Sequence, residues 1–350
     1  MPKIVKYAVI GAGSIAQHRH LPEAHANEQS TVVAIADPVK RRVADVAGHY
    51  EAKPFGDYRK MLADKSLGID AVVVATPNAL HAPMTIDALR AGYHVLCEKP
   101  MATSRADARK MIATAKQKRR SLMIGMNQRL MPSHAKAREI LDTGRLGRVI
   151  SFDTTFKHGG PEGWSADGTR SWFFKKKLAG MGVCGDLGVH KADLMRYLLG
   201  EEIVRVGGLI KTLDKKINGK LISLDDNAYV VMESASGTVG SMNISWTHNG
   251  RLEDNGTILY CQHGVMRLGM DPTFGVMVDL SNGQRERYEV GAMASNTQQV
   301  ASGIIDAFTD AIQSRRKPEI DGMEGYRATN IIITAMEAAK AGRFKKVSLA

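Results

Sequence analysis

The sequence predicts an α/β N-terminal domain with a doubly wound parallel sheet, followed by an α+β C-terminal domain with an open, largely antiparallel mixed sheet. Three observations support this prediction. Short Val- and Ile-rich runs alternate with helical patterns in the first third of the chain, a glycine-rich turn follows the first run, and turn-separated apolar runs fill the chain after about residue 150. We therefore expect one domain at 1–126 and a second at 127–350.

The first domain is expected to contain several short buried strands joined by helices. Parallel strands need crossover connections, which are right-handed and place helices on both faces of the sheet. The predicted strands are Tyr7–Ile10, Thr31–Ala36, Ala71–Ala75, His94–Cys97 and Leu122–Gly125, and the clearest helices are Met84–Ala91 and Arg105–Lys118. This pattern is typical of a nucleotide-binding Rossmann domain.

The second domain has a different hydropathy pattern, in which apolar runs follow one another with turn signals between them. The predicted strands are Val149–Phe156, Val204–Ile210, Ala228–Glu233, Val239–Trp246, Thr257–Cys261, Val265–Leu268 and Val276–Leu280. Turns at Ser236-Gly237, Asn249-Gly250 and Asn282-Gly283 suggest antiparallel hairpins. Helices are expected at about Leu187–Leu199, Thr297–Gln313 and Tyr326–Ala341.

Composition excludes several classes of protein. No apolar run approaches the roughly 18 residues that a membrane span needs, and the N-terminus reads as a strand instead of a signal peptide. We therefore expect a cytoplasmic protein with three reduced cysteines and no metal site. The net charge is +12, but only 6% of residues are aromatic and no nucleic-acid motif is present, so we expect no nucleic-acid partner. The Lys175–Lys177 run is either a solvated loop or a device that attracts anionic ligands.

A dinucleotide-binding motif follows the first predicted strand. The run Gly11-Ala12-Gly13-Ser14-Ile15-Ala16 fits G-x-G-x-x-A, which gives a tight turn, a close approach of backbone to pyrophosphate, and a helix N-terminus that favours anions. About twenty residues on, Asp37 ends the next strand and is expected to bind the ribose hydroxyls of NAD. Lys40, Arg41 and Arg42 follow it, and one of them would be able to neutralise a 2′-phosphate, so NADP stays an alternative.

Two further strand ends carry candidate residues, because open α/β sheets bind ligands at the carboxyl ends of their strands. Thr76, Pro77, Asn78 and His81 follow one strand and are assigned to the cofactor's ribose and phosphates. The next strand ends in Glu98-Lys99-Pro100, which puts a lysine where the nicotinamide is expected. Such a lysine is suited to proton transfer or to polarising a substrate oxygen. The Lys99–Pro100 peptide is either cis or trans.

A second candidate constellation lies in the C-terminal domain, in the run from Gly180 to Asp193. Its glycines permit close approach of the backbone to a ligand. Asp186, His190 and Asp193 stand at i, i+4 and i+7, so a helix would place all three on one face. A histidine beside a carboxylate is a suitable acid or base near neutral pH.

These motifs, taken in order, resemble the glucose–fructose oxidoreductase / inositol dehydrogenase / rhizopine catabolism (Gfo/Idh/MocA) family. The resemblance covers nearly the whole chain and rests on the following runs: Gly11–Ala16, Thr76-Pro77-Asn78 with His81, Glu98-Lys99-Pro100, Asn127-Gln128-Arg129 and Gly180–Asp193. It implies NAD(P)-dependent oxidation or reduction of a sugar, inositol or related polyol. It also implies a homodimer or homotetramer formed through the C-terminal sheet.

The resemblance assigns roles residue by residue. Lys99, Asp186 and His190 match the family's catalytic residues, and Glu98 and Asn127 join the cofactor-binding set together with Gly11, Gly13, Ser14, Ile15, Asp37, Arg41, Thr76, Pro77, Asn78 and His81. On the substrate side, Arg129, His158, Trp172, Asp186 and His190 are expected to line the cleft. Core packing for Trp172 and solvent exposure for His158 are the alternatives. Met181 interrupts the family's glycine triplet and is expected to narrow the pocket.

The expected reaction is a reversible hydride transfer in which His190 takes the hydroxyl proton, Lys99 stabilises the alkoxide or relays the proton, and Asp186 orients the pair. This mechanism requires Lys99 and the Asp186–His190 helix to meet at one nicotinamide ring. Three other hypotheses stay open: the same fold with glycoside cleavage or aldose–aldose transfer, a non-enzymatic NAD(P)-sensing regulator, and a reductase of nucleotide sugars, dipeptides or biliverdin-like compounds. The absence of a long N-terminal extension speaks against aldose–aldose transfer.

Overall fold

A computed structural model describes residues 3–291 and 301–348, which pack as two compact units. The first unit contains the chain up to Asn127, the segment Trp164–Ala179 and a stretch that ends at Tyr326. The second contains Gln128–Gly163, a long stretch from Gly180 and the chain from Arg327 onward. The division at residues 126 and 127 stays a prediction about functional parts; by packing, two later segments belong with the first unit.

The first unit is built on a parallel six-stranded sheet in the order β3-β2-β1-β4-β5-β6, which confirms the predicted doubly wound domain. Its strands are β1 Val5–Ile10, β2 Ser30–Ala36, β3 Lys53–Phe55, β4 Ala71–Val74, β5 His94–Cys97 and β6 Leu122–Ile124. Every residue of β4 is buried, as expected for a strand covered on both faces. The short strand β3 escaped prediction because Lys53 and Pro54 break the apolar pattern.

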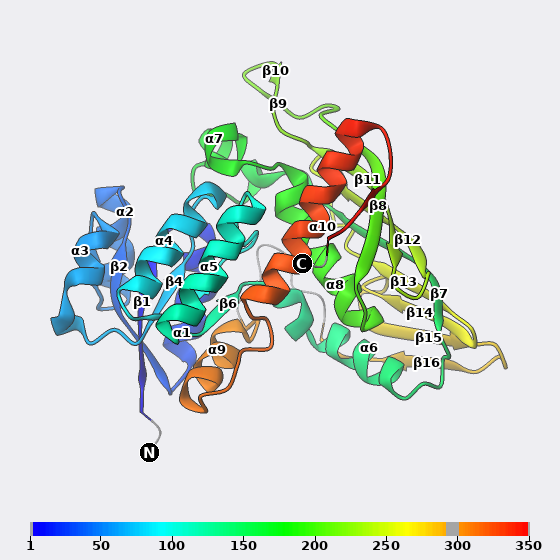
Figure 1. Cartoon of the computed structure of the whole chain (residues 1–350), viewed down its shortest axis with the longest axis horizontal. Helices are drawn as coiled ribbons and strands as arrows, with labels where there is room; N and C mark the ends of the chain where they lie inside the picture. The colour runs from blue at the N-terminus through cyan, green and yellow to red at the C-terminus, as the bar shows by residue number, and fades with distance from the viewer. Residues whose placement is uncertain (1–2, 292–300, 349–350) are drawn as a thin grey trace. The chain divides into compact units, whose positions relative to one another are not determined.

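The helices of the first unit cover this sheet, and α4 and α5 lie side by side over it (Figure 1). They are the π-helical turn η1 Ala16–His20 and the helices α1 Leu21–Ala26, α2 Lys40–His49, α3 Tyr58–Ala63, α4 Asn78–Arg90 and α5 Arg105–Lys118. Helix α4 begins at Asn78 instead of the predicted Met84, and it contains Pro83. A proline normally marks a helix boundary, which is why the sequence suggested a later start.

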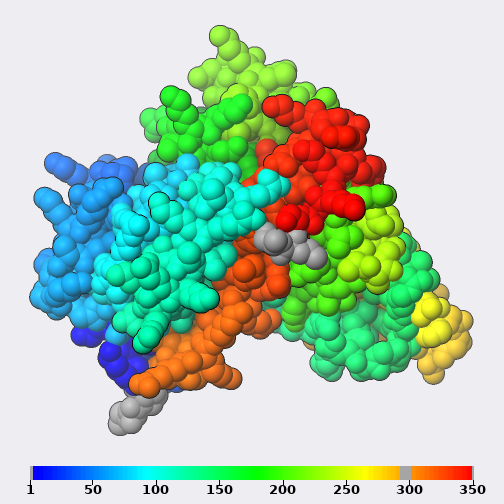
Figure 2. Space-filling view, viewed as in Figure 1, coloured from blue at the N-terminus to red at the C-terminus, as the bar shows by residue number. Residues whose placement is uncertain are grey.

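Residues from the C-terminal third complete the first unit. Figure 2 shows α9, Ile304–Gln313 in orange, directly beside the blue N-terminal residues. The hydroxyls of Tyr7 and Thr309 lie 2.8 Å apart, and the Ile124 N–H donates to the Ile320 carbonyl over 2.9 Å. The predicted helix Thr297–Gln313 therefore starts at Ile304 within the described residues; positions 297–300 lie outside them.

The second unit is built on a nine-stranded sheet in the order β16-β15-β14-β13-β7-β12-β11-β8-β17. The strands are β7 Val149–Lys157, β8 Ile203–Lys211, β11 Asn227–Ser234, β12 Val239–Ser245, β13 Thr257–Cys261, β14 Gly264–Leu268, β15 Val276–Leu280, β16 Arg285–Tyr288 and β17 Lys345–Lys346. A small hairpin, β9 Lys216–Ile217 with β10 Lys220–Leu221, stands apart. Within the described part of this sheet, β7 and β12 run parallel and the other pairs are antiparallel, which confirms the predicted mixed sheet.

Two of the three predicted hairpins are present. Ser236-Gly237 joins β11 to β12, and Asn282-Gly283 joins β15 to β16. The prediction for Asn249-Gly250 was wrong, because β7 lies between β12 and β13 and keeps them from pairing. The helices packed on the sheet include α6 Pro132–Asp142 and α8 Val189–Leu199, and the same unit contains the part of α10, Gly322–Ala341, from Arg327 onward.

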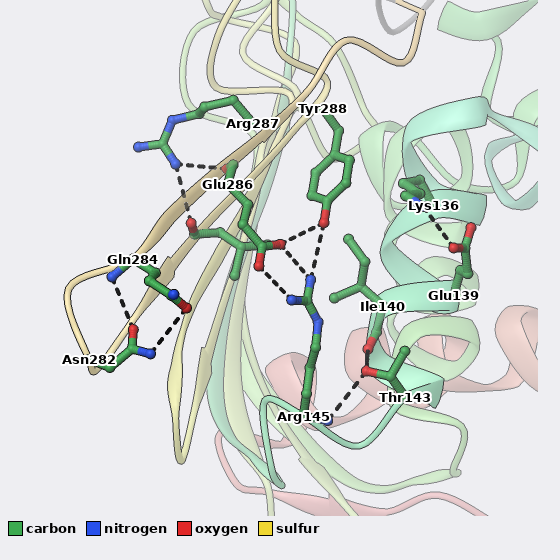
Figure 3. Close-up of polar contacts among 11 residues, drawn as sticks. Lys136, Glu139, Ile140, Thr143, Arg145, Asn282, Gln284, Glu286, Arg287 and Tyr288 are labelled. Carbon is green, nitrogen blue, oxygen red and sulfur yellow. Dashed lines mark hydrogen bonds and ion pairs between the residues drawn. The ribbon is translucent and has the colours of Figure 1, made fainter.

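The edge strand β16 is held by charged contacts (Figure 3). Both terminal nitrogens of Arg145 donate to the carboxylate of Glu286, and Arg145 also donates to the Tyr288 hydroxyl. The hydrogen bonds that Glu286 accepts from Arg145 and from the Tyr288 hydroxyl lower its pKa to about 2. Lys136 of α6 lies over the Tyr288 ring, 5.1 Å from its centre. A charged edge of this kind protects a sheet from pairing with other chains.

Candidate active site

The glycine-rich turn after β1 has the geometry that a dinucleotide requires. Gly11 has φ of +97°, and its N–H donates to the Ala36 carbonyl over 2.8 Å. A Cβ at this position would lie 2.2 Å from the Ala75 carbonyl oxygen, so only glycine fits. At Gly13 a Cβ would meet no heavy atom within 4 Å, which leaves open space beside the backbone for a phosphate. Ser14 and Ile15 continue this turn into the first helix and are partly exposed.

Asp37 at the end of β2 is fixed in position by the backbone. Its two carboxylate oxygens accept from the N–H groups of Ala12 and Val39, each over 2.9 Å, and the side chain is buried. Each oxygen retains acceptor capacity for a ribose hydroxyl. Arg42 lies close to this carboxylate, at 3.9 Å, whereas the predicted Arg41 is exposed and lies near Asp45 instead.

The ends of β4 and β5 are tied together by His81. Its Nε2 lies 2.7 Å from the Thr76 carbonyl oxygen and its Nδ1 lies 2.8 Å from the Pro100 carbonyl oxygen. Burial lowers the pKa of this imidazole. Asn78 donates through Nδ2 to the Ala179 carbonyl over 2.9 Å. Among the residues that the structure describes, none forms a hydrogen bond with the buried Thr76 hydroxyl, which is therefore suited to bind a ligand.

Glu98 is the buried centre of a charge cluster at the end of β5. Its carboxylate lies 2.8 Å from His20 Nε2 and 3.3 Å from an Arg19 terminal nitrogen, and it accepts from the Lys99 N–H over 3.1 Å. Although burial opposes it, the hydrogen bond with His20 and the nearby Arg19 guanidinium hold the pKa of Glu98 well below its usual range. The cluster therefore fixes the backbone that carries Lys99, whose peptide bond to Pro100 is cis. Arg19 and His20 were missed because they lie inside an ordinary-looking helical stretch.

Together these observations fit NAD(P) to the first unit. The strand ends lie side by side, since the N–H groups of Gly11, Ala75, Glu98 and Gly125 donate to the ends of neighbouring strands. The edge offers an open glycine turn, an anchored carboxylate and an unpartnered hydroxyl. Pro77 directly follows Thr76, and buried Asn127 follows β6 at the same edge.

The second unit brings the predicted Asp186 together with aromatic and imidazole groups. Asp186 lies in a π-helical turn, Cys184–Gly188, which leads directly into α8. Its carboxylate accepts from the indole N–H of Trp246 over 3.0 Å and lies 3.7 Å from His158 Nε2. The rings of His158 and His190 both contact Phe156, with ring centres 6.1 and 6.2 Å away. His158 is 6% exposed, so the alternative of solvent exposure is wrong.

Asp225 was not predicted, but it holds the start of the segment that carries Asp186. Its two carboxylate oxygens accept from the N–H groups of Gly182 and Cys184, over 2.9 and 2.7 Å. A Cβ at Gly182 would lie 1.9 Å from the Asp225 carbonyl oxygen, which explains that glycine. The intervening Met181 is buried. One weak signal was present in the sequence, a pair of aspartates just before a predicted strand.

Asp193 takes part in a different contact from Asp186. Arg129 donates to both oxygens of Asp193, over 2.8 and 2.5 Å, and lies over the Tyr197 ring. The π-helical turn interrupts the regular spacing, so i, i+4 and i+7 do not give these carboxylates a common set of partners. Trp172 belongs to the first unit and stacks on Phe173, with ring centres 3.8 Å apart. The substrate roles of Arg129 and Trp172 stay predictions.

Lys191 follows His190 in α8 and is completely buried. Its Nζ lies 3.5 Å from the Thr257 hydroxyl and 5.8 Å from the centre of the Phe156 ring. Burial lowers its pKa to about 7, and the Asp254 carboxylate offsets only part of that effect. A lysine among polar neighbours in sequence is normally a surface residue, so nothing in the pattern predicted this one.

The part of the chain that the structure describes contains neither a helix suited to crossing a membrane nor a cluster of metal ligands. No helix within residues 3–291 or 301–348 has the length and apolar character that crossing a bilayer requires. In the same ranges, no group of three or more His, Cys, Asp or Glu side chains is arranged to hold a metal ion.

The fold and the candidate site are those of an NAD-binding oxidoreductase. Comparison with known proteins identifies the family. Residues 5–126 match the model described as "Oxidoreductase family, NAD-binding Rossmann fold", and residues 134–267 match the "GFO/IDH/MocA C-terminal domain". The chain belongs to the Gfo/Idh/MocA family.

Named relatives include two sugar or polyol dehydrogenases. Levoglucosan dehydrogenase of Pseudarthrobacter phenanthrenivorans is 31% identical over 261 residues, which are 66% of this chain and 64% of that enzyme. Inositol 2-dehydrogenase of Rhizobium meliloti is 29% identical over 258 residues, which are 72% of this chain and 73% of that enzyme. Among solved structures, the aldose–aldose oxidoreductase from Caulobacter crescentus, complexed with glycerol, superposes with a TM-score of 0.83 at 26% identity, covering 98% of this chain and 100% of that one.

Proposed function

We propose that this oxidoreductase transfers a hydride between NAD and a secondary alcohol carbon of a sugar, inositol or related polyol. The observation that carries the proposal is the buried group formed by Asp186, Trp246, His158 and His190 in the second unit. The family supplies the NAD-binding domain, and the named relatives act on levoglucosan and inositol.

The proposed roles follow from the chemistry of each side chain. Bound NAD supplies the hydride acceptor. His190 takes the hydroxyl proton of the substrate, because an imidazole accepts a proton near neutral pH. Asp186, anchored by the Trp246 indole, orients the imidazole or a substrate hydroxyl. Lys99 stabilises the alkoxide that develops as the proton leaves, and the Glu98 cluster fixes the backbone from which Lys99 extends.

Initial rates with a panel of inositol isomers and simple sugars, measured separately with NAD and NADP, test the reaction and its substrate class. Lys99→Ala and His190→Ala should each reduce turnover by about 10²-fold or more, while NAD binding measured by calorimetry stays nearly unchanged. Lys110→Ala and His263→Ala, which change exposed residues of the same types, serve as controls.

The double variant separates shared from independent roles. If Lys99 and His190 act on one proton transfer, the combined loss is much smaller than the product of the single losses. Full turnover in both single variants would contradict the role assignment. Absence of turnover on every polyol with either cofactor, despite NAD binding, would favour a sensor or a different substrate class.

A second candidate is aldose–aldose oxidoreduction, which the Caulobacter crescentus structure favours because it aligns over its full length. The expectation that such enzymes have a long N-terminal extension therefore does not count against this candidate, because that structure covers 98% of this chain and is itself covered to 100%. In such a reaction one aldose is oxidised and another reduced, so the nicotinamide returns to its starting oxidation state within one catalytic cycle. Conversion of a sugar mixture without added NAD, by protein that retains nicotinamide after gel filtration, would select this candidate.

We propose in addition that the chain assembles into a homodimer or homotetramer through the uncovered face of the second sheet. Tyr229 and Leu209 pair across β11 and β8 and are 54% and 64% exposed, and Val231 follows on the same face. Exposed apolar side chains grouped in this way are typical of an interface. Light scattering should give a multiple of 38.1 kDa for the native protein, and Tyr229→Lys should shift it towards the monomer. A native monomer would contradict this assembly.

A further inference from the structure

We infer that Asp167, in the segment Trp164–Ala179, holds Arg42 away from a 2′-phosphate and thereby helps to select NAD over NADP. Arg42 Nη2 donates to Asp167 Oδ1 over 2.6 Å, while Arg42 Nη1 lies 3.9 Å from Asp37 Oδ2. The guanidinium is thus shared between two carboxylates, both within the first unit. The inference rests on dinucleotide binding at Asp37 and not on which alcohol is oxidised.

Arg42 is the basic side chain whose position affects the choice between NAD and NADP. It lies in the first turn of α2, and its contact with Asp37 puts it beside the carboxylate expected to bind the ribose hydroxyls. A guanidinium at such a place is the usual partner of a 2′-phosphate, because its donors match phosphate oxygens in pairs. Arg41 is 93% exposed and lies near Asp45, and Lys40 is exposed.

Asp167 is available to hold Arg42, because within the described part of the chain its carboxylate accepts no hydrogen bond from the helix that follows it. It stands directly before that short helix, Gly168–Arg170. The Arg42 side chain is 21% exposed and that of Asp167 is 42% exposed, so solvent screens this ion pair in part. An arginine near a helix N-terminus is opposed by the helix dipole, and the two carboxylates offset that cost.

The segment that carries Asp167 is itself fixed on the first unit. Its last residue, Ala179, accepts a hydrogen bond from Asn78 at the start of α4. Within the segment, the Trp164 ring packs edge-on against Phe173, with ring centres 5.1 Å apart. Asp167 therefore has a defined position relative to Arg42. A chain segment distant in sequence from the β2 end contributes to the choice of cofactor there.

Calorimetric titration with adenosine 2′,5′-bisphosphate and with ADP tests the inference without any substrate. In Asp167→Asn the carboxylate becomes a neutral amide of the same shape, which frees Arg42. We expect affinity for the bisphosphate to rise about tenfold, the size of one charge-assisted contact, while affinity for ADP changes little. Asp45→Asn, which removes the carboxylate beside Arg41, is the matched control and should leave both affinities unchanged.

A second pair of variants ties the gain to Arg42. Asp167→Ala should repeat the effect, and Asp167→Asn combined with Arg42→Gln should abolish it. The ratio of kcat/KM for NADP to that for NAD should follow the same order once a substrate is known. Equal tightening of both ligands, an equal effect of Asp45→Asn, or no change in Asp167→Asn would overturn the inference. Wild-type protein that binds neither ligand would overturn it by removing its premise, whereas lack of turnover alone would affect only the proposed reaction.

Discussion

Replacement of Lys191 by Met should stabilise the protein at neutral pH. The side chain of Lys191 is completely buried, and burial lowers its pKa from 10.5 to about 7. Because each pKa unit corresponds to about 1.36 kcal/mol, keeping the ammonium charged inside the folded protein costs on the order of 5 kcal/mol. Met has a similar length and needs no hydration. Its loss of the 3.5 Å contact to Thr257 is a small opposing effect.

The pH dependence identifies the cause. Between about pH 7 and 10.5 the unfolded chain binds a proton at Lys191 that the folded protein has lost, so unfolding becomes less favourable as pH rises. Below that range both states are protonated and the full cost is present. The stabilisation by Lys191→Met should therefore be about 2–4 kcal/mol at pH 7 and should fall by about 2 kcal/mol at pH 9.

Urea titrations at pH 7 and 9, followed by circular dichroism, measure these differences if the slope m is the same in all variants. Comparison with wild type at each pH cancels the titration of other groups, including the buried cysteines. Lys116→Met, which changes an exposed lysine of α5, should show no such difference. A variant that is less stable than wild type at pH 7, or a stabilisation that does not change with pH, would refute the reasoning.

Three further predictions concern the residues that hold the site. Gly11→Ala forces a side chain into a left-handed turn and against the neighbouring carbonyl; it should abolish NAD binding in calorimetry, and unchanged affinity would contradict the turn geometry. Asp225→Ala leaves two backbone N–H groups without acceptors and should lower the unfolding free energy by about 2–3 kcal/mol in urea titrations. Trp246→Phe removes the indole N–H from Asp186 and should lower kcat about tenfold with little change in NAD affinity; an unaltered kcat would show that this bond does not orient the carboxylate.

The sequence was sufficient for most of the fold because the apolar patterns of the strands are strong. Strands β5 and β13 have the predicted bounds, and the parallel order of the first sheet follows from its right-handed crossovers. The prediction that failed concerned strand pairing, which depends on contacts between residues far apart in the sequence. Asn249-Gly250 has the composition of a hairpin turn, but the strands on either side of it are separated by β7, which no local pattern reveals.

In the candidate site, too, residues within local motifs could be predicted from the sequence, whereas residues that act through distant contacts could not. The positions of Gly11 and Asp37 could be predicted because the fingerprint requires those residue types there, whereas the role of Lys99 stays a prediction. Asp225 and Trp246 were missed because each acts through a contact 41 or 60 residues distant in sequence. A helix pattern also assumes regular turns, so it could not anticipate the π-helical turn that gives Asp186 and Asp193 different partners.

The first unit contains residues from the C-terminal third of the chain, and this arrangement affects how the protein folds during synthesis. Tyr7 near the N-terminus bonds to Thr309, Glu23 accepts from the backbone at Ser302, and Ile124 of β6 bonds to Ile320. A chain emerging from the ribosome cannot make these bonds until almost all of it has been synthesised. The nucleotide-binding half, although encoded first, is therefore completed only after Ile320 has been made, and nascent chains depend on late residues to shield its apolar surface from aggregation.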